Sequence, residues 1–190
     1  MMTQSLRITL LTMTTALMAL VLSACAASTQ ATSRLDVNGL TVVTLDEAIV
    51  LARPGRQLAA AAGDYAYLGP VEINRMGKRD YFLWVGLAST IDRSLVGVPA
   101  PDVQVLAVVI DGRPMLLPLA LWSTELDQSP YKTLAPLYAT FAAHASLDQI
   151  RRISNAESVE VHLVSDSGVT RRYQKWQGDW STWSLLAATE

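Results

Sequence analysis

One stretch, residues 79–90 (RDYFLWVGLAST), constrains the fold more than any other part of the chain. The odd-numbered side chains from 81 to 87 are apolar or aromatic, and Phe82 and Trp84 between them are apolar as well. Successive side chains of a strand point to opposite faces, so this segment carries apolar groups on both of its faces. Such a strand must be covered on both sides. We therefore expect residues 79–90 to form a central strand of a sheet.

Turn signals divide the neighbouring segments into hairpins. Residues 64–73 (DYAYLGPVEI) have the composition of a strand, and Gly69-Pro70 predicts that it is an edge strand or a bulged strand. The turn after it contains Gly77, which is available for a positive φ. Two later pairs of apolar segments turn at Asp111-Gly112 and at residues 165–168 (SDSG), which indicates two further hairpins.

Three segments have helical signals. Residues 46–53 (DEAIVLAR) begin with acidic residues and end before Pro-Gly, which favours a short helix. Residues 146–156 (SLDQIRRISNA) have the strongest pattern, because Ser and Gln at the first and fourth positions form a capping box. Residues 178–190 (GDWSTWSLLAATE) predict a short terminal helix capped by Asp179 or Ser181.

The pattern as a whole predicts an α+β fold. We expect about seven strands in hairpins and about two or three short helices, which fits a mainly antiparallel sheet with the helices on one face. Residues 137–144 fit either a strand or a helix.

The N-terminus has the parts of a secretory signal peptide. Arg7 provides a positive charge, residues 8–22 carry no charge and are mostly apolar, and two small residues follow. The run of 15 residues is shorter than the roughly 20 that a spanning helix needs. We therefore expect residues 1–24 to be a signal peptide. An ordinary signal, cleaved near Ala24 or Ala27, is the alternative.

The only cysteine of the chain, Cys25, follows this segment directly. The sequence Leu22-Ser23-Ala24-Cys25 resembles the lipobox of bacterial lipoproteins. The resemblance implies cleavage before Cys25 and acylation of its sulfur and its new amino group, with palmitate as a typical acyl chain. Several acyl chains anchor a protein stably where one does not. In Gram-negative members of this class, Asp after the cysteine favours the inner membrane; Ala26 at that position implies the outer membrane.

The chain after the cleavage site predicts one domain on a tether. Residues 26–38 are small and polar without periodicity, so residues 25–38 would be an acylated cysteine followed by a flexible tether. We expect residues 39–190 to form a single periplasmic domain, because a chain of this size can bury about 70% of its unfolded surface. That domain has no cysteine for a disulfide. Without Arg7, 14 basic residues stand against 17 acidic ones, which argues against a nucleic-acid partner.

Candidate catalytic groups are few. His144 and Asp148 would share a helix face if the helix began early, and Ser146, Ser165 or Ser167 could complete a hydrolase triad. The sequence contains no Gly-x-Ser-x-Gly elbow, no metal-ligand spacing and no glycine-rich phosphate loop. We expect no enzyme activity, no metal and no cofactor; a hydrolase that uses His144 is the alternative.

Aromatic residues gather near the C-terminus. Trp176, Trp180 and Trp183 lie close together in the sequence, and Tyr173 precedes them. If exposed, these rings could stack on a sugar or another ligand. If buried, they would cover the sheet as an apolar plug, because an indole buries a large area wherever it packs.

Basic residues gather at the predicted hairpin after residue 73. Arg75, Lys78 and Arg79 are the best candidates in the chain for contact with an anionic partner such as lipid head groups. The alternative is a hairpin tip whose charges are solvated.

The sequence therefore predicts a binding protein without catalysis. We expect an outer-membrane lipoprotein, lipid-anchored and facing the periplasm, that acts as an envelope accessory or assembly subunit. Its partners would be the membrane, through the lipid, and another envelope protein. A small-ligand or glycan-binding module that uses the C-terminal tryptophans is the alternative.

Overall fold

The structure is a computed structural model that describes residues 31–35, 39–54, 63–92, 94, 102–122 and 129–188. The strands are β1 (Ala31–Leu35), β2 (Thr41–Leu45), β3 (Ile49–Ala52), β4 (Asp64–Arg75), β5 (Lys78–Ser89), β6 (Val105–Ile110), β7 (Arg113–Pro118), β8 (Ala120–Leu121), β9 (Leu137–His144), β10 (Val159–Val164) and β11 (Thr170–Gln177). The helices are α2 (Leu147–Ser154), the 3-10 turn η2 (Trp180–Trp183) and α3 (Ser184–Ala187).

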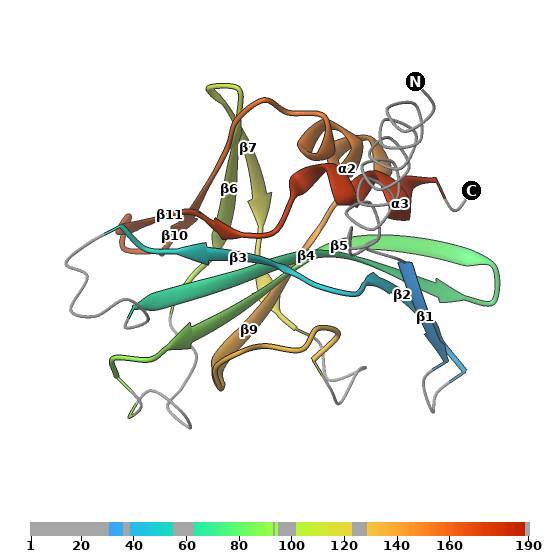
Figure 1. The fold of residues 1–190 in the computed structure, drawn as a ribbon, viewed down its shortest axis with the longest axis horizontal. Helices are drawn as coiled ribbons and strands as arrows, with labels where there is room; N and C mark the ends of the chain where they lie inside the picture. Colours follow the sequence, from blue (N-terminus) through green and yellow to red (C-terminus); the bar gives the residue numbers. More distant parts are fainter. Residues whose placement is uncertain are drawn as a thin grey trace, which may run out of the picture.

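The strands form one antiparallel sheet that curls into a nearly closed barrel (Figure 1). Their order is β7-β6-β10-β11-β3-β4-β5-β9-β8, with β2 beside β4 and β1 beside β2. The prediction of an α+β fold of about seven strands with helices on one face is wrong. The chain forms hairpins as predicted, but they pair with one another around a ring, and short local patterns carry no information about that closure.

A single segment, residues 113–121, closes the ring. Only Leu119 separates β7, which pairs with β6, from β8, which pairs with β9 at the other end of the strand order. The N–H of Leu119 donates to the carbonyl of Gln104 at 2.7 Å, and the N–H of Trp122 donates to the carbonyl of Thr140 at 3.0 Å. One continuous stretch of chain is therefore bonded to both ends of the sheet.

The strand β4 is internal, although Gly69-Pro70 predicts an edge or a bulge. It pairs with β5 along its whole length, without a shift of register at Gly69-Pro70. On its other side it changes partner, because β3 pairs with residues 65–68 and β2 with residues 71–74. Pro70 lies between the two partners, where a backbone N–H is not required. The edge-strand prediction is wrong because proline is accommodated at this junction.

The same junction holds the loop of residues 129–136 against the outside of the barrel. The phenol of Tyr131 donates a hydrogen bond to the carbonyl of Pro70. A Cβ at Gly69 would lie 2.5 Å from the Tyr131 ring, so only glycine leaves room for it. The indole of Trp84 lies beside the phenol, with ring centroids 5.6 Å apart. Trp84 and Tyr131 are both buried, so this loop covers the outer face of β5.

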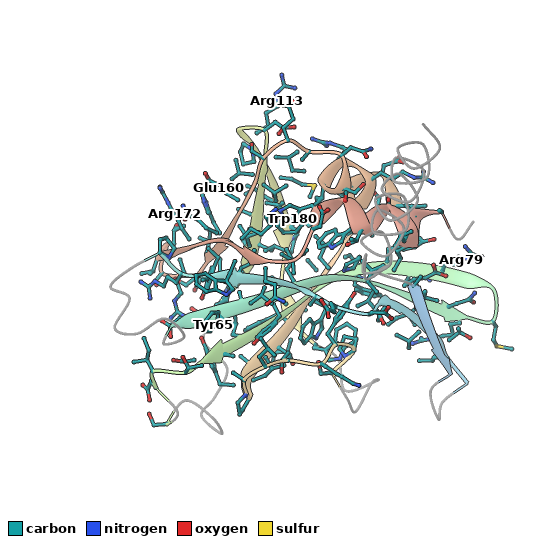
Figure 2. The ribbon with its side chains drawn as sticks, viewed as in Figure 1. Tyr65, Arg79, Arg113, Glu160, Arg172 and Trp180 are labelled. Atoms are coloured by element: carbon teal, nitrogen blue, oxygen red, sulfur yellow. The ribbon has the colours of Figure 1, made fainter. Side chains whose placement is uncertain are left out.

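The barrel interior is filled by apolar side chains. The pairing registers put alternate residues of neighbouring strands on one shared face, as in the set Leu68, Val85 and Phe141. The opposite face carries the exposed Glu160 and Arg172, so the shared apolar face is the inner one (Figure 2). Buried residues of this inner face include Ile49, Leu51, Leu68, Leu83, Val85, Leu87, Leu106, Val108, Phe141, Val161, Leu163 and Tyr173. The prediction that residues 79–90 form a central strand covered on both faces is confirmed.

The helices lie together at one end of the barrel (Figure 1). The predicted capping box of α2 is present: the hydroxyl of Ser146 accepts from the N–H of Gln149 at 3.2 Å, and the Gln149 side chain accepts from the N–H of Ser146 at 2.7 Å. The predicted terminal helix is confirmed as η2 followed by α3, with Asp179 as the cap of η2. The backbone N–H of Ser181 donates to the Asp179 carboxylate, and this hydrogen bond lowers the pKa of that carboxyl.

Two segments differ from their predicted structure, and a third adopts one of its two predicted alternatives. Residues 46–53 are not a helix but contain β3, because Ile49 and Leu51 face the interior while Val50 faces outward. Residues 137–144 are the strand β9. Residues 31–35 form β1, paired antiparallel with β2, so regular structure begins inside the predicted tether.

The packing of the Tyr131 ring against Gly69 gives a first prediction. The variant Gly69→Ala should lower the free energy of unfolding by about 1–3 kcal/mol, because its methyl group overlaps the Tyr131 ring. The matched control is Gly63→Ala, whose Cβ would have no neighbour nearer than 3.6 Å. Urea denaturation followed by far-UV circular dichroism measures both. Equal stability of the two variants would contradict the proposed packing.

Buried tyrosines make the fold sensitive to alkali. Burial raises the pKa of Tyr131 and of Tyr138, and it raises the pKa of Tyr173 from 10.0 to about 12. The folded state then holds these protons more tightly than the unfolded chain, so stability is complete below the unfolded pKa and falls as the pH rises above it. For Tyr173 the expected loss is about 1.4 kcal/mol per pH unit between the two pKa values. Denaturation midpoints at increasing pH measure it, and Tyr173→Phe should remove that contribution.

Candidate functional site

The outer wall of the barrel carries a hollow that we call the aromatic groove. It consists of two adjacent cavities of about 260 and 370 Å³ that share Val50, Tyr67 and Leu134 as lining residues. Tyr65 and Trp176 line the first cavity. The second is more polar, and it is lined in addition by Asp46, Glu47, Ala48, Lys132, Thr133 and Gln177.

Strand alternation explains why these rings face outward. Tyr65 and Tyr67 stand two positions apart on β4, on the face opposite to the buried inner Leu68. Val50 pairs with Tyr67 and shares its face. Leu134 comes from the loop that Tyr131 anchors, and its side chain is 85% exposed. The groove therefore lies between the sheet surface and a loop that the Tyr131 hydrogen bond attaches to β4.

A bulge turns Trp176 toward this groove. The register between β11 and β3 shifts between Lys175 and Gln177, which leaves Trp176 without a partner in the ladder. Bulges of this kind re-aim a side chain. Gly178 follows with φ +99°, and a Cβ there would lie 2.7 Å from Ile49, so the chain passes close over β3. The indole of Trp176 remains 54% exposed.

The structure separates the four aromatic residues that the sequence groups as a ligand site. Tyr173 is buried on the inner face of β11. Trp180 and Trp183 are buried at the helical end of the barrel. Their rings pack edge to face, with centroids 5.1 Å apart. Burial of these three side chains favours the packing alternative for them. Trp176 alone is exposed beside a cavity.

The partners of Trp176 are not apparent from the sequence. Tyr65, Tyr67 and Leu134 lie far from it along the chain, and only the pairing of β11 with β3 and of β3 with β4 brings them together. A signal was present in the segment DYAY, whose two tyrosines occupy one face of a strand.

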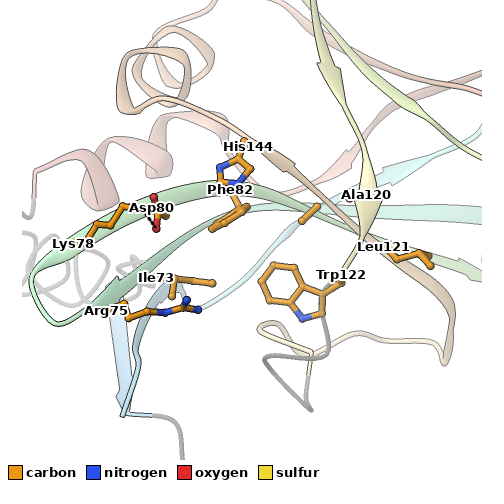
Figure 3. A pocket seen from close by; sticks show the side chains of 10 residues that line it. Ile73, Arg75, Lys78, Asp80, Phe82, Ala120, Leu121, Trp122 and His144 are labelled. Carbon is orange, nitrogen blue, oxygen red and sulfur yellow. Dashed lines mark ion pairs between the residues drawn. The ribbon is translucent and has the colours of Figure 1, made fainter. Parts of the chain in front are cut away.

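A second hollow on the outer wall, which we call the basic pocket, has a volume of about 400 Å³ (Figure 3). It lies between β4, β5, β8 and β9 and is lined by Ile73, Arg75, Lys78, Asp80, Phe82, Ala120, Leu121, Trp122, Ala142 and His144. The Phe82 ring lies 4.3 Å from the His144 ring and 6.4 Å from the Trp122 ring, measured between centroids.

The three basic residues of the β4–β5 hairpin are divided between two faces. Arg75 pairs with Lys78 in the register, and both line the basic pocket. Arg79 points to the other face, where its Nε lies 3.5 Å from the carboxylate of Glu72, a buried residue. Removal of one partner of a buried ion pair is destabilising, so Arg79 serves the fold. The cationic surface of the hairpin is therefore Arg75 and Lys78.

The groups suggested for a hydrolase have other contacts. His144 ends β9 and α2 begins at Leu147, so His144 and Asp148 do not share a helix. Asp148 lies 3.5 Å from Arg151, and Ser146 caps α2. Ser165 and Ser167 bond to each other at 2.8 Å in the β10–β11 turn. Within the described part of the chain, no cluster of three His, Cys, Asp or Glu side chains is placed to hold a metal ion.

The predicted lipidation site cannot be placed in this fold. Cys25, the signal peptide of residues 1–24 and most of the predicted tether lie outside the described residues. None of the helices in the described part of the chain has the length and apolar character of a membrane span.

Comparison of the chain with protein-family models, with curated proteins and with solved structures finds no match.

The different settings of the tryptophans give a second pair of matched variants. Trp183→Ala should lower the free energy of unfolding by about 3–5 kcal/mol, because the lost indole leaves a cavity in the core. Trp176→Ala should change it by less than about 1 kcal/mol, because its side chain is half exposed. Thermal unfolding followed by circular dichroism measures both. A larger loss for Trp176→Ala than for Trp183→Ala would show that the roles are reversed.

Proposed function

We propose that the chain is a lipid-anchored lipoprotein of the bacterial outer membrane that acts as an accessory or assembly subunit. Its barrel binds another envelope protein through the aromatic groove and carries out no catalysis. The observation that supports this proposal best is the groove itself, in which an exposed tryptophan and an exposed leucine stand beside two tyrosines of the sheet.

The packing of the barrel favours a site on its outside. The inner face is occupied by buried apolar side chains, so a ligand of useful size would have to displace the core. Most strands of the ring are paired with a neighbour on each side, so a partner gains little by adding a strand to them. The exceptions are β7 and β8, which stand at the two ends of the strand order and each pair with one strand. Recognition then depends on side chains of the outer wall.

The composition of the groove suits a protein partner. Tyr and Trp are enriched among the residues that carry most of the binding energy of protein interfaces. Trp176, Tyr65 and Leu134 provide apolar area at one end, while Asp46 and Lys132 provide charged groups at the other. Protein interfaces commonly combine an apolar contact area with polar groups beside it.

A second function, binding of a glycan or small ligand, has one observation in its favour. The half-exposed Trp176 ring borders a cavity of about 260 Å³, which is near the lower limit for small-molecule pockets. Stacking of a sugar on this ring needs no other aromatic residue.

The lipobox supports the anchor, and the position of β1 limits the reach of the barrel. If Cys25 is acylated, residues 26–30 are the link to β1, which begins at Ala31. Five extended residues span at most about 18 Å. The barrel would then stay close to the membrane surface, and its partner would be a membrane protein or a protein held near the membrane.

Site-specific crosslinking in living cells tests the proposed interface. A photoreactive amino acid in place of Leu134 should capture one or two discrete envelope proteins, which mass spectrometry of the membrane fraction identifies. The control is the same amino acid in place of Leu116, which is 66% exposed on β7 and is not among the groove residues. Addition of Trp176→Ala should reduce the yield at position 134 by about tenfold or more, as expected for an interface tryptophan.

The same experiment separates the alternatives. Loss of the crosslinked species with Cys25→Ser would support the anchored form as the active one. Equal capture at positions 134 and 116 would argue against the groove as an interface. Glycan fragments in place of protein, lost with Trp176→Ala, would favour the ligand-binding function.

A further inference from the structure

The basic pocket differs from the aromatic groove in position and chemistry. It lies on the outer face of the β4–β5 hairpin and of β9, and the two sites have no lining residue in common. Its volume of about 400 Å³ falls in the range of small-molecule sites. Nothing in the proposed docking function uses it.

Strand register brings its polar and apolar groups onto one face. Arg75 stands opposite Lys78 and Ile73 stands opposite Asp80 in the β4–β5 ladder. Phe82 follows Asp80 on the same face, two positions along β5, and pairs with His144 of β9. Charged residues therefore occupy the end near the hairpin turn, and aromatic residues occupy the end toward the centre of the sheet.

The aromatic end presents a wall for a flat or apolar group. The planes of the Phe82 and Trp122 rings are nearly perpendicular, at 89°. The His144 ring also packs against Phe82, with an angle of 42° between the two ring planes. Figure 3 shows Arg75 and Ile73 reaching from β4 toward the Trp122 indole. Burial of an apolar group against such rings is favourable without any specific hydrogen bond.

The charged end attracts an anion. Arg75 and Lys78 are the two basic residues among those that line the pocket, and Asp80 is the acidic one. The Nζ of Lys78 lies 3.5 Å from the Asp80 carboxylate, but the two side chains are 78% and 37% exposed. Ion pairs with this exposure are weak. Lys78 can therefore turn to a ligand at little cost, and a guanidinium beside it suits a phosphate or a carboxylate.

We propose that the basic pocket binds a small organic anion, with a phosphate or carboxylate group at Arg75 and Lys78 and an apolar ring against Phe82 and Trp122. The site is a second one, independent of the docking of an envelope protein in the aromatic groove. Both parts of the ligand are required, because the charges alone are exposed to solvent and the aromatic wall alone gives no orientation.

Calorimetric titration with 1-naphthyl phosphate tests this proposal. The protein is purified as the cell processes it, in nanodiscs of phosphatidylcholine if it carries acyl chains and in buffer if it does not. Naphthyl phosphate should bind with one-to-one stoichiometry. Inorganic phosphate and 1-naphthol, each of which has one half of the chemistry, should bind about tenfold more weakly or not at all.

Charge variants locate the site. Arg75→Gln and Lys78→Gln should each weaken naphthyl phosphate binding about fivefold, as expected for one exposed charge contact. Asp80→Asn should strengthen naphthyl phosphate binding, because it removes a negative charge that repels the negative phosphate. The matched control is Arg172→Gln, an exposed arginine on β11 outside the pocket, which should leave binding unchanged (Figure 2).

Three results would overturn the proposal. Equal binding of 1-naphthol would show that the pocket is only apolar. Equal loss with Arg172→Gln would show that anion binding responds to any change in the overall charge of the protein and not to this site. Association only with vesicles of phosphatidylglycerol, with no binding of naphthyl phosphate, would show that the cations face anionic lipid. None of these results depends on crosslinking at Leu134, so the two proposals fail separately.

Discussion

The hydrogen bond from the phenol of Tyr131 to the carbonyl of Pro70 joins the fold of this protein to its outer surface. Gly69 and Pro70 lie where β4 changes partner from β3 to β2, so the backbone there is not used by a neighbouring strand on that side. Glycine leaves space for the ring, and proline has no N–H that would need an acceptor from a neighbouring strand. Gly69 and Pro70 would weaken an ordinary strand, but here they form the surface on which the loop of residues 129–136 packs. That loop forms one side of the aromatic groove.

Closure of the barrel determines where binding can occur. Residues 113–121 bond to both ends of the sheet, and the inner face is then sealed around an apolar core. A closed ring with a filled interior has two places left for recognition, its outer wall and its ends. The helices α2 and α3 and the turn η2 occupy one end, where Trp183 is buried. Both candidate sites lie on the outer wall.

Local features of the fold could be predicted from sequence, and their long-range arrangement could not. The capping box at Ser146, the Asp179 cap and the turns at Gly77 and Asp111-Gly112 depend on residues within a few positions of one another, and the structure contains them. The helix predicted for residues 46–53 failed because acidic and Pro-Gly flanks resemble helix ends, whereas tertiary pairing with β4 and β11 makes the apolar run a strand. The groove could not be predicted either, because long-range strand pairing brings its lining residues together. Trp176 was a visible candidate, but its neighbours Tyr65 and Leu134 are joined to it only through the sheet order.

One strand connects the two candidate sites. Along the outer face of β4, Tyr65 and Tyr67 line the groove, Gly69 receives Tyr131, and Arg75 lines the basic pocket. From Tyr67 to Arg75 the strand advances about 27 Å at its usual rise, so the sites are too far apart for one small ligand to contact both. Between the two sites lies Gly69-Pro70, where β4 changes partner and where the Tyr131 ring packs. The loop that carries Leu134 is held at that point, so the geometry of the groove depends on the same two residues that interrupt the ladder.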